Sequence, residues 1–517
     1  MRRQTIPLVV ISAIVLFQLL TGLWHIKDPF IDGRYHYNWN PPFWLINAEA
    51  TNRVGIAHSF FGVVSGVADT PGVGAEATAY YESHPQLIGP LFALWTRVMG
   101  YSEWSPRLLS LLLIAGTTLI FFTALRVIFG WRFATGFAAI FVQLPLIFVY
   151  GKMLNHEPLV LFFIAVSFWG FVKVIRVAPY GLPLLITGIL GMALSDWSGF
   201  VFGGLFMLIM LAPPLGRARA IRRAALWICA TLLLGLAIFF IQSYLQKASL
   251  GVAAPDLGAF MARYMDLWRY RSGQETTIPW HIWLGKELIF VNRNYSLILW
   301  IAGMAGLGGA LIKKSKLAMS PERMAAVWFF IAIVVGQMFY LVSLKQATFI
   351  HLYYQYFFSL PVAFGTVLLL DRIAGSVRSV QNRHRVLLAA AAAITLASGL
   401  YSVHVYTRLL TKEMWGDRSD IALVRSLRDL PKDARIIVAD NQTALDWFAN
   451  PNIIYYAGRA PERFTLAEVP HAPYQIVPAS MAPALTKLLI SGKAYGVAMP
   501  TDTLGCSTHF CLLHLHE

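Results

Sequence analysis

Charged residues are scarce in this chain: Asp, Glu, Lys and Arg make up 13% of its 517 residues, whereas hydrophobic residues make up 57%. Soluble globular proteins carry roughly 25% charged residues, so this composition excludes an ordinary soluble protein. Apolar runs of membrane length recur along most of the sequence, as is typical of transmembrane helices. We therefore predict a polytopic integral membrane protein.

The sequence also lacks the short motifs of common soluble enzymes. It has no P-loop, no HExxH motif, no nucleophile elbow and no dinucleotide fingerprint, which argues against those nucleotide- and metal-dependent classes. The histidines before residue 160 show no zinc-ligand spacing, so we predict no metal site and no cofactor, and nothing indicates a divalent cation. These histidines are His25, His36, His58, His84 and His156.

Acidic residues are few, and the formal net charge is +16. The basic residues lie in short connections between apolar runs, such as "RARAIRR" (217–223) and "KKSK" (313–316). The positive-inside rule produces this distribution without a polyanion, so we predict the lipid bilayer and not nucleic acid as a partner. The same rule predicts a multi-pass protein of the plasma or inner membrane, with its N-terminus cytoplasmic and its C-terminus outside.

Apolar runs of about 16 to 22 residues predict eleven transmembrane helices. The predicted fold class is an all-α polytopic bundle with interfacial helices in its first outer loop and a small C-terminal α/β domain outside the membrane. The predicted spans lie near residues 7–24, 108–125, 133–150, 158–172, 181–195, 199–213, 224–244, 295–312, 324–344, 354–370 and 386–407.

Two long loops and a tail fall on the outer side in this topology. We assign residues 1–411 to a transmembrane domain, with outer loops at 25–107 and 245–294, and residues 412–517 to the α/β domain. In the tail, residues 433–459 have the pattern of a strand, a turn, a helix and a second strand. Long outer segments on a bundle with short inner turns place the working surface outside.

The three cysteines give a weaker signal. Cys506 and Cys511 flank "STHF" in the tail and form either a hairpin disulfide, which suits an oxidising outer compartment, or two separate thiols. Cys229 lies within an apolar run, where packing is its simplest role.

Several outer connections offer side chains for proton transfer. Asp32 follows the first apolar run in "DGRYHYN", and a partly shielded carboxylate at the membrane surface can act as a general base. His156 and Glu157 lie in "LNHEPL", and Asp196 lies in "SDWSG". Any one such acid taken alone is more often solvated surface. Together they predict one cavity at the outer ends of the helices, with Asp32, Glu157 and Asp196 as catalytic candidates.

The second outer loop alternates basic and aromatic residues, as in "RYMDLWRYR". Arginine presents a rigid fork to phosphate oxygens, and interfacial aromatics pack beside lipid. We therefore predict that Arg269 and Arg271 bind a lipid-linked phosphate; simple attraction to anionic lipid explains the pattern equally well. Lys345 and His351, in "KQATFIHLYYQ", are candidates for the same phosphate or sugar pocket.

The first 180 residues resemble a known family. "DGRYHYN", "SHPQLIGPLFALWTRVMGYSEWSPR" and "FVYGKMLNHEPLVLFF" look like the C-type membrane glycosyltransferases, in particular the branch of protein O-mannosyltransferases and lipid A aminoarabinose transferases. The family's His/Lys-Pro-Pro-Leu-like stretch matches His84, Pro85 and Leu87, and later elements match Glu103 and Arg107. The remaining spans resemble the family in topology alone.

The resemblance implies transfer of a sugar from a polyprenyl-phosphate donor to a glycan, lipid or protein acceptor on the outer face. It implies that Asp32 is the base. Our leading interpretation is an inverting reaction, with Arg34, Tyr35, His84 and His156 as candidates for binding substrate. The chain departs from the family at two places. Gly33 stands where a second acid is frequent, and Glu157 where an aspartate is usual.

Other functions stay open at this stage. An oligosaccharyltransferase or ligase would use a preassembled lipid-linked glycan on nearly the same fold. A transporter or flippase of lipid-linked sugars would need polar or broken helices at mid-membrane, whereas the polar residues here gather at helix ends. A scaffold or receptor would use the outer acidic and aromatic residues for adhesion only.

Overall fold

The computed structural model divides into two compact units. The first comprises Met1–Ile26, Tyr81–Ile88 and Arg107–Arg408, and the second comprises Lys27–Tyr80, Gly89–Pro106 and Leu409–Glu517. The structure describes residues 2–30, 37–65, 80–81, 83–212, 219–249, 257–274, 278–312, 319–375, 379–412, 418–429, 436–440, 455–458, 462–465, 474–478, 501–506 and 510–515.

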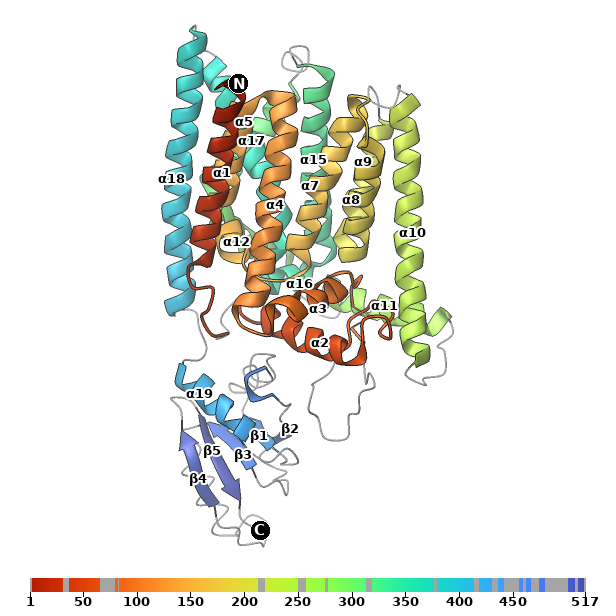
Figure 1. Cartoon of the computed structure of the whole chain (residues 1–517), viewed down its shortest axis with the longest axis vertical. Helices are drawn as coiled ribbons and strands as arrows, with labels where there is room; N and C mark the ends of the chain where they lie inside the picture. Colours follow the sequence, from red (N-terminus) through yellow and green to blue (C-terminus); the bar gives the residue numbers. More distant parts are fainter. Residues whose placement is uncertain are drawn as a thin grey trace. The chain divides into compact units, whose positions relative to one another are not determined.

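The first unit is a bundle of helices that run mostly side by side (Figure 1). Its core is mainly apolar, with aromatic side chains stacked between neighbouring helices. The helices are α1 (Arg2–Leu23), α4 (Trp104–Phe129), α5 (Trp131–Gln143), α6 (Pro145–Tyr150), α7 (His156–Ile175), α8 (Gly181–Ser195), α9 (Trp197–Leu211), α10 (Arg219–Ser249), α11 (Leu257–Ser272), α12 (Trp280–Tyr295), α13 (Leu297–Ala310), α15 (Pro321–Ser343), α16 (Lys345–Ile350), η2 (Leu352–Phe358), α17 (Ser359–Gly375) and α18 (Val380–Lys412).

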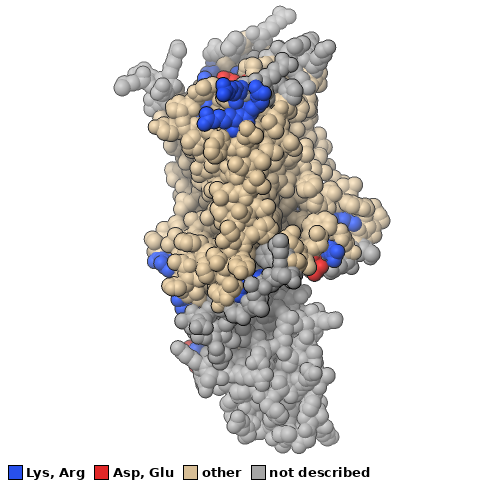
Figure 2. Space-filling view, turned by 90° about the vertical axis from the view of Figure 1, so that its right-hand side faces the viewer, with Lys and Arg blue, Asp and Glu red and all other residues tan. Residues whose placement is uncertain are grey.

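The bundle has the length and composition of a membrane domain. Among the described residues, seven helices are long and apolar enough to cross a bilayer, and the pair α12 and α13, bent by 92°, would make an eighth. Figure 2 shows a broad belt without charged side chains, with Lys and Arg at both of its ends and the largest group of them at one end. The prediction of an all-α polytopic membrane bundle is confirmed. The number of eleven spans stays a prediction, because α8 and α9 are only 15 residues long.

Close packing of α7 against α8 builds the corner that carries the candidate site. A Cβ atom added at Gly188 would lie 2.5 Å from the backbone nitrogen of Ser167 on α7, so only glycine permits this approach. Small residues at such contacts are typical of membrane helices, whose association depends on close packing. The contact brings the N-terminus of α7 beside the C-terminus of α8.

The second unit contains α2 (Asn40–Val54), α3 (Ile88–Met99), α19 (Arg418–Ser426), η3 (Leu427–Asp429) and a five-stranded sheet of order β2-β1-β3-β5-β4. Strands β2, β1 and β3 are parallel, and β5 and β4 are antiparallel additions. The domain boundary at 411/412 stays a prediction. The strands are β1 (Ile436–Asp440), β2 (Glu462–Thr465), β3 (Tyr474–Pro478), β4 (Thr501–Cys506) and β5 (Phe510–Leu515).

Two details of the tail bear on the sequence predictions. The expected second strand is wrong at residues 455–457, which form a helical turn. The reason is that the rings of Tyr455 and Tyr456 pack on the buried Phe30, at centroid distances of 5.5 and 6.4 Å. Cys506 and Cys511 are partners in the β4–β5 ladder, and whether they form a disulfide stays a prediction.

Candidate functional site

The site is built around the break between α8 and α9, where "SDWS" interrupts two apolar runs. Asp196 has extended backbone angles and caps α9, since its Oδ2 accepts hydrogen bonds from the backbone N–H of Ser198 at 3.0 Å and from its hydroxyl at 2.5 Å. The Oδ1 atom of Asp196 lies 2.6 Å from Nδ1 of His84. Both carboxylate oxygens are therefore engaged, and the residue is only 3% exposed.

Backbone atoms of the short segment Tyr81–Ile88 form hydrogen bonds with residues at the break between α8 and α9. The N–H of Leu87 donates to the carbonyl oxygen of Leu194 at 2.9 Å, and the indole of Trp197 donates to the carbonyl oxygen of Ser83 at 2.9 Å. The amides of Gln86 and Gln246 join the segment to α10 at 3.1 Å. These contacts fix His84 between α9 and α11.

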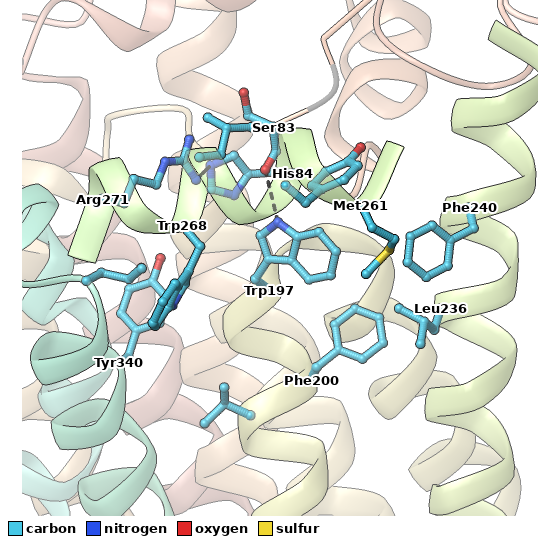
Figure 3. Close-up of a pocket in the computed structure, with 14 residues that line it drawn as sticks. Ser83, His84, Trp197, Phe200, Leu236, Phe240, Met261, Trp268, Arg271 and Tyr340 are labelled. Atoms are coloured by element: carbon cyan, nitrogen blue, oxygen red, sulfur yellow. Dashed lines mark hydrogen bonds between the residues drawn. The ribbon is translucent and has the colours of Figure 1, made fainter. Parts of the chain in front are cut away.

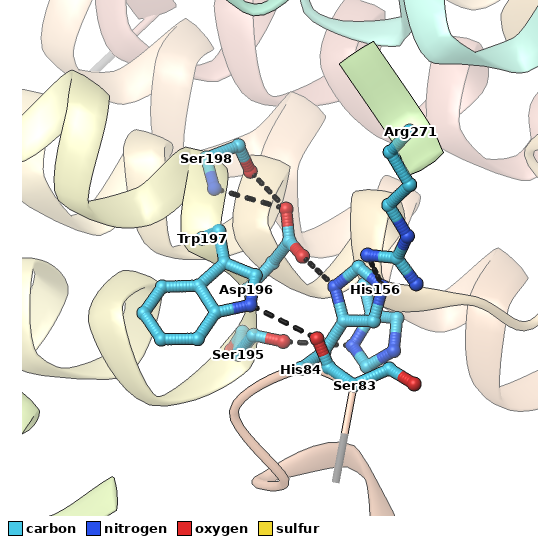
Figure 4. Close-up of polar contacts among 8 residues, drawn as sticks. All are labelled: Ser83, His84, His156, Ser195, Asp196, Trp197, Ser198 and Arg271. Carbon is cyan, nitrogen blue, oxygen red and sulfur yellow. Dashed lines mark hydrogen bonds and ion pairs between the residues drawn. The ribbon is translucent and has the colours of Figure 1, made fainter. Parts of the chain in front are cut away.

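His84 joins Asp196 to an arginine of α11 (Figure 4). The NH1 atom of Arg271, on α11, lies 2.8 Å from Nε2 of His84. A guanidinium group can only donate hydrogen bonds, so Nε2 is the acceptor and Nδ1 carries the proton that it donates to Asp196. The geometry therefore assigns a neutral imidazole, 6% exposed, between a carboxylate and a guanidinium.

The electrostatics agree with this assignment. Burial, and then the charge of Arg271, lower the pKa of His84 against the opposing effect of Asp196. Burial would raise the pKa of Asp196, but the hydrogen bonds that its carboxylate accepts from His84 and Ser198 outweigh burial and lower the pKa. Asp196 is thus ionised and His84 is neutral near pH 7.

A second histidine stacks on the first. The rings of His84 and His156 lie 4.7 Å apart, and Tyr81 stacks on both at about 6 Å. Nδ1 of His156 lies 2.7 Å from the carbonyl oxygen of Ser195 and donates to it. Glu157 is also buried at 5% exposure, and its Oε2 has no hydrogen-bond partner among the described residues.

An apolar pocket of about 630 Å³ opens beside this polar cluster. Figure 3 shows Ser83, His84 and Arg271 together at one end, with aromatic and aliphatic side chains around the rest. The volume is in the range of small-molecule sites. A ligand with an anionic head and an apolar body suits this division. The apolar lining includes Trp197, Phe200, Leu236, Phe240, Met261 and Trp268.

The structure brings together five of the predicted site residues: His84, His156, Glu157, Asp196 and Arg271. Asp32, Arg34 and Tyr35 lie outside the described residues.

Three other predicted residues have different surroundings. Arg269 is 54% exposed at its side chain and pairs with Asp266 at 3.3 Å. Lys345 donates to the carbonyl oxygen of Ile278 and lies 4.4 Å from the ring centroid of Trp280. His351 packs on Tyr353 and Tyr354 at centroid distances of 5.2 and 5.4 Å.

Sequence reasoning missed Tyr81, Ser83, Trp197 and Ser198. The Asp-x-Ser spacing of a helix N-cap was the available signal for Ser198. Within the described part of the chain, no group of three or more His, Cys, Asp or Glu side chains is arranged to hold a metal ion.

Comparisons with solved structures place this geometry on a known fold. The chain superposes on ArnT from Cupriavidus metallidurans bound to undecaprenyl phosphate, with a TM-score of 0.63 and 12% identity over 97% of each chain. It also matches the Archaeoglobus fulgidus oligosaccharyltransferase (TM-score 0.57, 12% identity, 94% of this chain and 71% of that one). The arabinofuranosyltransferase AftD from mycobacteria matches at a TM-score of 0.50 and 15% identity, over 98% of this chain and 40% of that chain.

These likenesses confirm the predicted resemblance at the level of fold: the chain has the fold of the C-type membrane glycosyltransferases, as in ArnT. In comparisons of sequence, no protein-family model and no curated protein matches the chain.

Proposed function

We propose that the protein is a membrane glycosyltransferase that moves a sugar from a polyprenyl-phosphate donor to a glycan, lipid or protein acceptor. The observation that carries this proposal is the position of Arg271 at the polar end of the apolar pocket. A lipid-linked sugar phosphate has the matching chemistry, with an anionic phosphate beside a long apolar chain. The fold of a protein crystallised with undecaprenyl phosphate supports the same class of ligand.

The proposed reaction joins the acceptor hydroxyl to the donor sugar and releases the prenyl phosphate. The acceptor hydroxyl oxygen attacks the anomeric carbon and loses its proton to Asp32, while the bond between that carbon and the phosphate oxygen breaks. Attack opposite the leaving group inverts the anomeric centre. The prenyl phosphate leaves with the bonding electrons, and Arg271 stabilises its negative charge. The role of Asp32 rests on the sequence resemblance.

The proposed site lies on the outer face of the membrane. This orientation rests on the basic inner connections, which the positive-inside rule assigns to the cytoplasm. His156 and Asp196 lie at the ends of α7 and α9, and so the polar residues gather where helices end. A flippase would need such groups at mid-membrane. Transfer of a preassembled glycan is the second candidate, since the fold is also that of an oligosaccharyltransferase.

The experiment is a binding and transfer assay on purified protein with a radiolabelled polyprenyl-phosphate sugar. The Arg271→Ala variant should weaken donor binding by about 2 to 5 kcal/mol, as expected when one partner of a shielded charge pair is removed. Arg269→Ala is the matched control, because the exposed Arg269 lies on the same helix and should leave donor affinity unchanged.

Unchanged affinity in Arg271→Ala would move the phosphate site elsewhere, with Lys345 as the next candidate. Absence of released prenyl phosphate from wild-type protein with every acceptor class would contradict transfer itself. Donors carrying one sugar or a preassembled glycan, tested side by side, distinguish the two candidate functions.

A further inference from the structure

Asp196, His84 and Arg271 form a continuous chain of hydrogen bonds that ends at the pocket. The first link is 2.6 Å and the second is 2.8 Å. The carboxylate is fixed in turn by Ser198 at the start of α9. The three residues come from three separate segments, so this chain sets where the guanidinium lies relative to the pocket.

We propose that Asp196 and His84 are positioning residues for Arg271, and that donor binding requires His84 in its neutral form and is lost on acidification. This inference rests on the proposed function, in which Arg271 binds the donor phosphate. It adds a condition to that function, namely the protonation state of a residue that need not touch the donor.

The physical reason lies at Nε2 of His84. In the neutral ring this atom accepts the hydrogen bond from Arg271. A proton on Nε2 would place two donors and two positive charges 2.8 Å apart, with the other ring nitrogen already held by Asp196. The arginine would then turn away from its present position. A histidine that bound phosphate directly would behave in the opposite way, because its protonated form would bind the anion more tightly.

Every charged or titratable neighbour of His84 bears on its protonation. Asp196 and Arg271 contact its two nitrogens, and Tyr81 and His156 stack with its ring. Burial and Arg271 lower its pKa, and Asp196 opposes them. His84 is thus neutral at pH 7 and becomes protonated as the pH falls through a pKa below 6.5. Farther groups coupled to Arg271 or Asp196 are Glu157, Tyr340 and Tyr354.

The experiment measures donor affinity between pH 5 and pH 8 on the full-length protein. A phosphodiester-linked sugar is the probe, because a diester does not titrate in this range. Wild-type affinity should fall about tenfold per pH unit once the pH is below the pKa of His84. The His84→Gln variant should bind with an affinity independent of pH, since the amide oxygen can accept from Arg271 and does not titrate.

Asp196→Asn separates positioning from mere stability. Asparagine still caps α9, so the variant should fold. Loss of the negative charge lowers the pKa of His84 further. The fall in donor affinity at low pH, which we call the acid limb, should therefore begin at a lower pH. Asp266→Asn is the matched control, because this exposed carboxylate on α11 pairs with Arg269, and the variant should show the same loss of affinity at low pH as the wild-type protein. A role for Asp196 in stability alone would leave the pH profile unmoved.

Two results would overturn the inference: wild-type affinity that rises on acidification, or an acid limb that persists in His84→Gln. The Arg271→Ala variant keeps this test separate from the proposed function. If Arg271→Ala loses donor binding while either result is found, the phosphate site stands and the positioning role of a neutral His84 is wrong. If Arg271→Ala binds donor normally, the proposed phosphate site itself fails.

Discussion

Each unit contains a polar cluster with a carboxylate and a guanidinium group, and the two clusters differ in how far they are exposed to solvent. In the first unit Asp196, His84 and Arg271 join a carboxylate to a guanidinium through a buried imidazole. In the second unit the carboxylate Oε1 of Glu103 contacts a guanidinium and a phenol directly, from Arg425 at 3.0 Å and Tyr456 at 3.2 Å. The side chains of Arg425 and Glu103 are 55% and 21% exposed.

The difference teaches what burial does to the same chemistry. The carboxylate of the first cluster is buried from solvent. Removing one member of this cluster therefore leaves the remaining polar groups without a hydrogen-bond partner. In the second cluster water can take over from either charged partner, and exposed ion pairs contribute little to stability. The first arrangement can therefore control a ligand site, whereas the second mainly holds chain segments together.

The largest expected effect comes from a change to the proposed base, Asp32. Asp32→Asn keeps the shape of the proposed base and removes its capacity to accept a proton, so transfer should fall at least about a hundredfold. Donor binding should be unchanged, in contrast to changes in the buried cluster. The measurement is transfer rate at saturating donor, with Asp28→Asn as the matched and milder control. Retention of most activity would reassign the base to Glu157.

Next in size is the cost of breaking the buried cluster. Asp196→Ala leaves Arg271 without its nearby counter-charge and Nδ1 of His84 without its acceptor, and it removes the cap of α9. We expect a loss of roughly 3 to 5 kcal/mol in the free energy of unfolding, measured in detergent.

Ser198→Ala is the matched control for this change. It removes one hydroxyl hydrogen bond from the same carboxylate and should cost about 1 kcal/mol. Equal losses in the two variants would show that the buried charge contributes no more to stability than a single hydroxyl hydrogen bond. The proposed difference between the two clusters would then be wrong.

The sequence predicted the fold because the signal for membrane helices is local. Each predicted span coincides with a helix or helix pair, since a long apolar run needs no partner to be recognised. The tail is different. Residues 455–457 have strand-like composition, but their tyrosines pack on Phe30, more than 400 positions away, and no local pattern reports such a contact.

The residues of the site could be predicted from the sequence, but the hydrogen bonds that join them could not. His84, His156, Glu157, Asp196 and Arg271 all carried signals in the sequence. The hydrogen bonds among them join residues 112 and 187 positions apart, which depends on how α8, α9 and α11 pack. Arg269 and Arg271 looked equivalent for the same reason. Residues two apart on a helix point to different sides, and only packing shows which of the two is less exposed.

A smaller effect is expected from the tyrosine of the second cluster. The hydroxyl of Tyr456 accepts a hydrogen bond from the backbone N–H of the buried Phe30 at 2.7 Å and donates to Glu103. Tyr456→Phe should cost about 1 to 2 kcal/mol locally, because a buried N–H loses this acceptor. Hydrogen exchange at the Phe30 amide should speed up by about tenfold. Tyr455→Phe is the control, and equal exchange in all three proteins would rule out the contact.

The smallest effect is expected for Arg425→Ala. Its guanidinium pairs with Glu103 and lies 4.8 Å from the ring centroid of Tyr456, but more than half of the side chain is in solvent. Exposed ion pairs typically contribute at most about 1 kcal/mol and weaken with salt. Unfolding measured at low and high salt should therefore show a small loss that disappears as the ionic strength rises. A loss as large as that of Asp196→Ala, unaffected by salt, would mean that this cluster is also shielded from water, and the contrast between the two units would not hold.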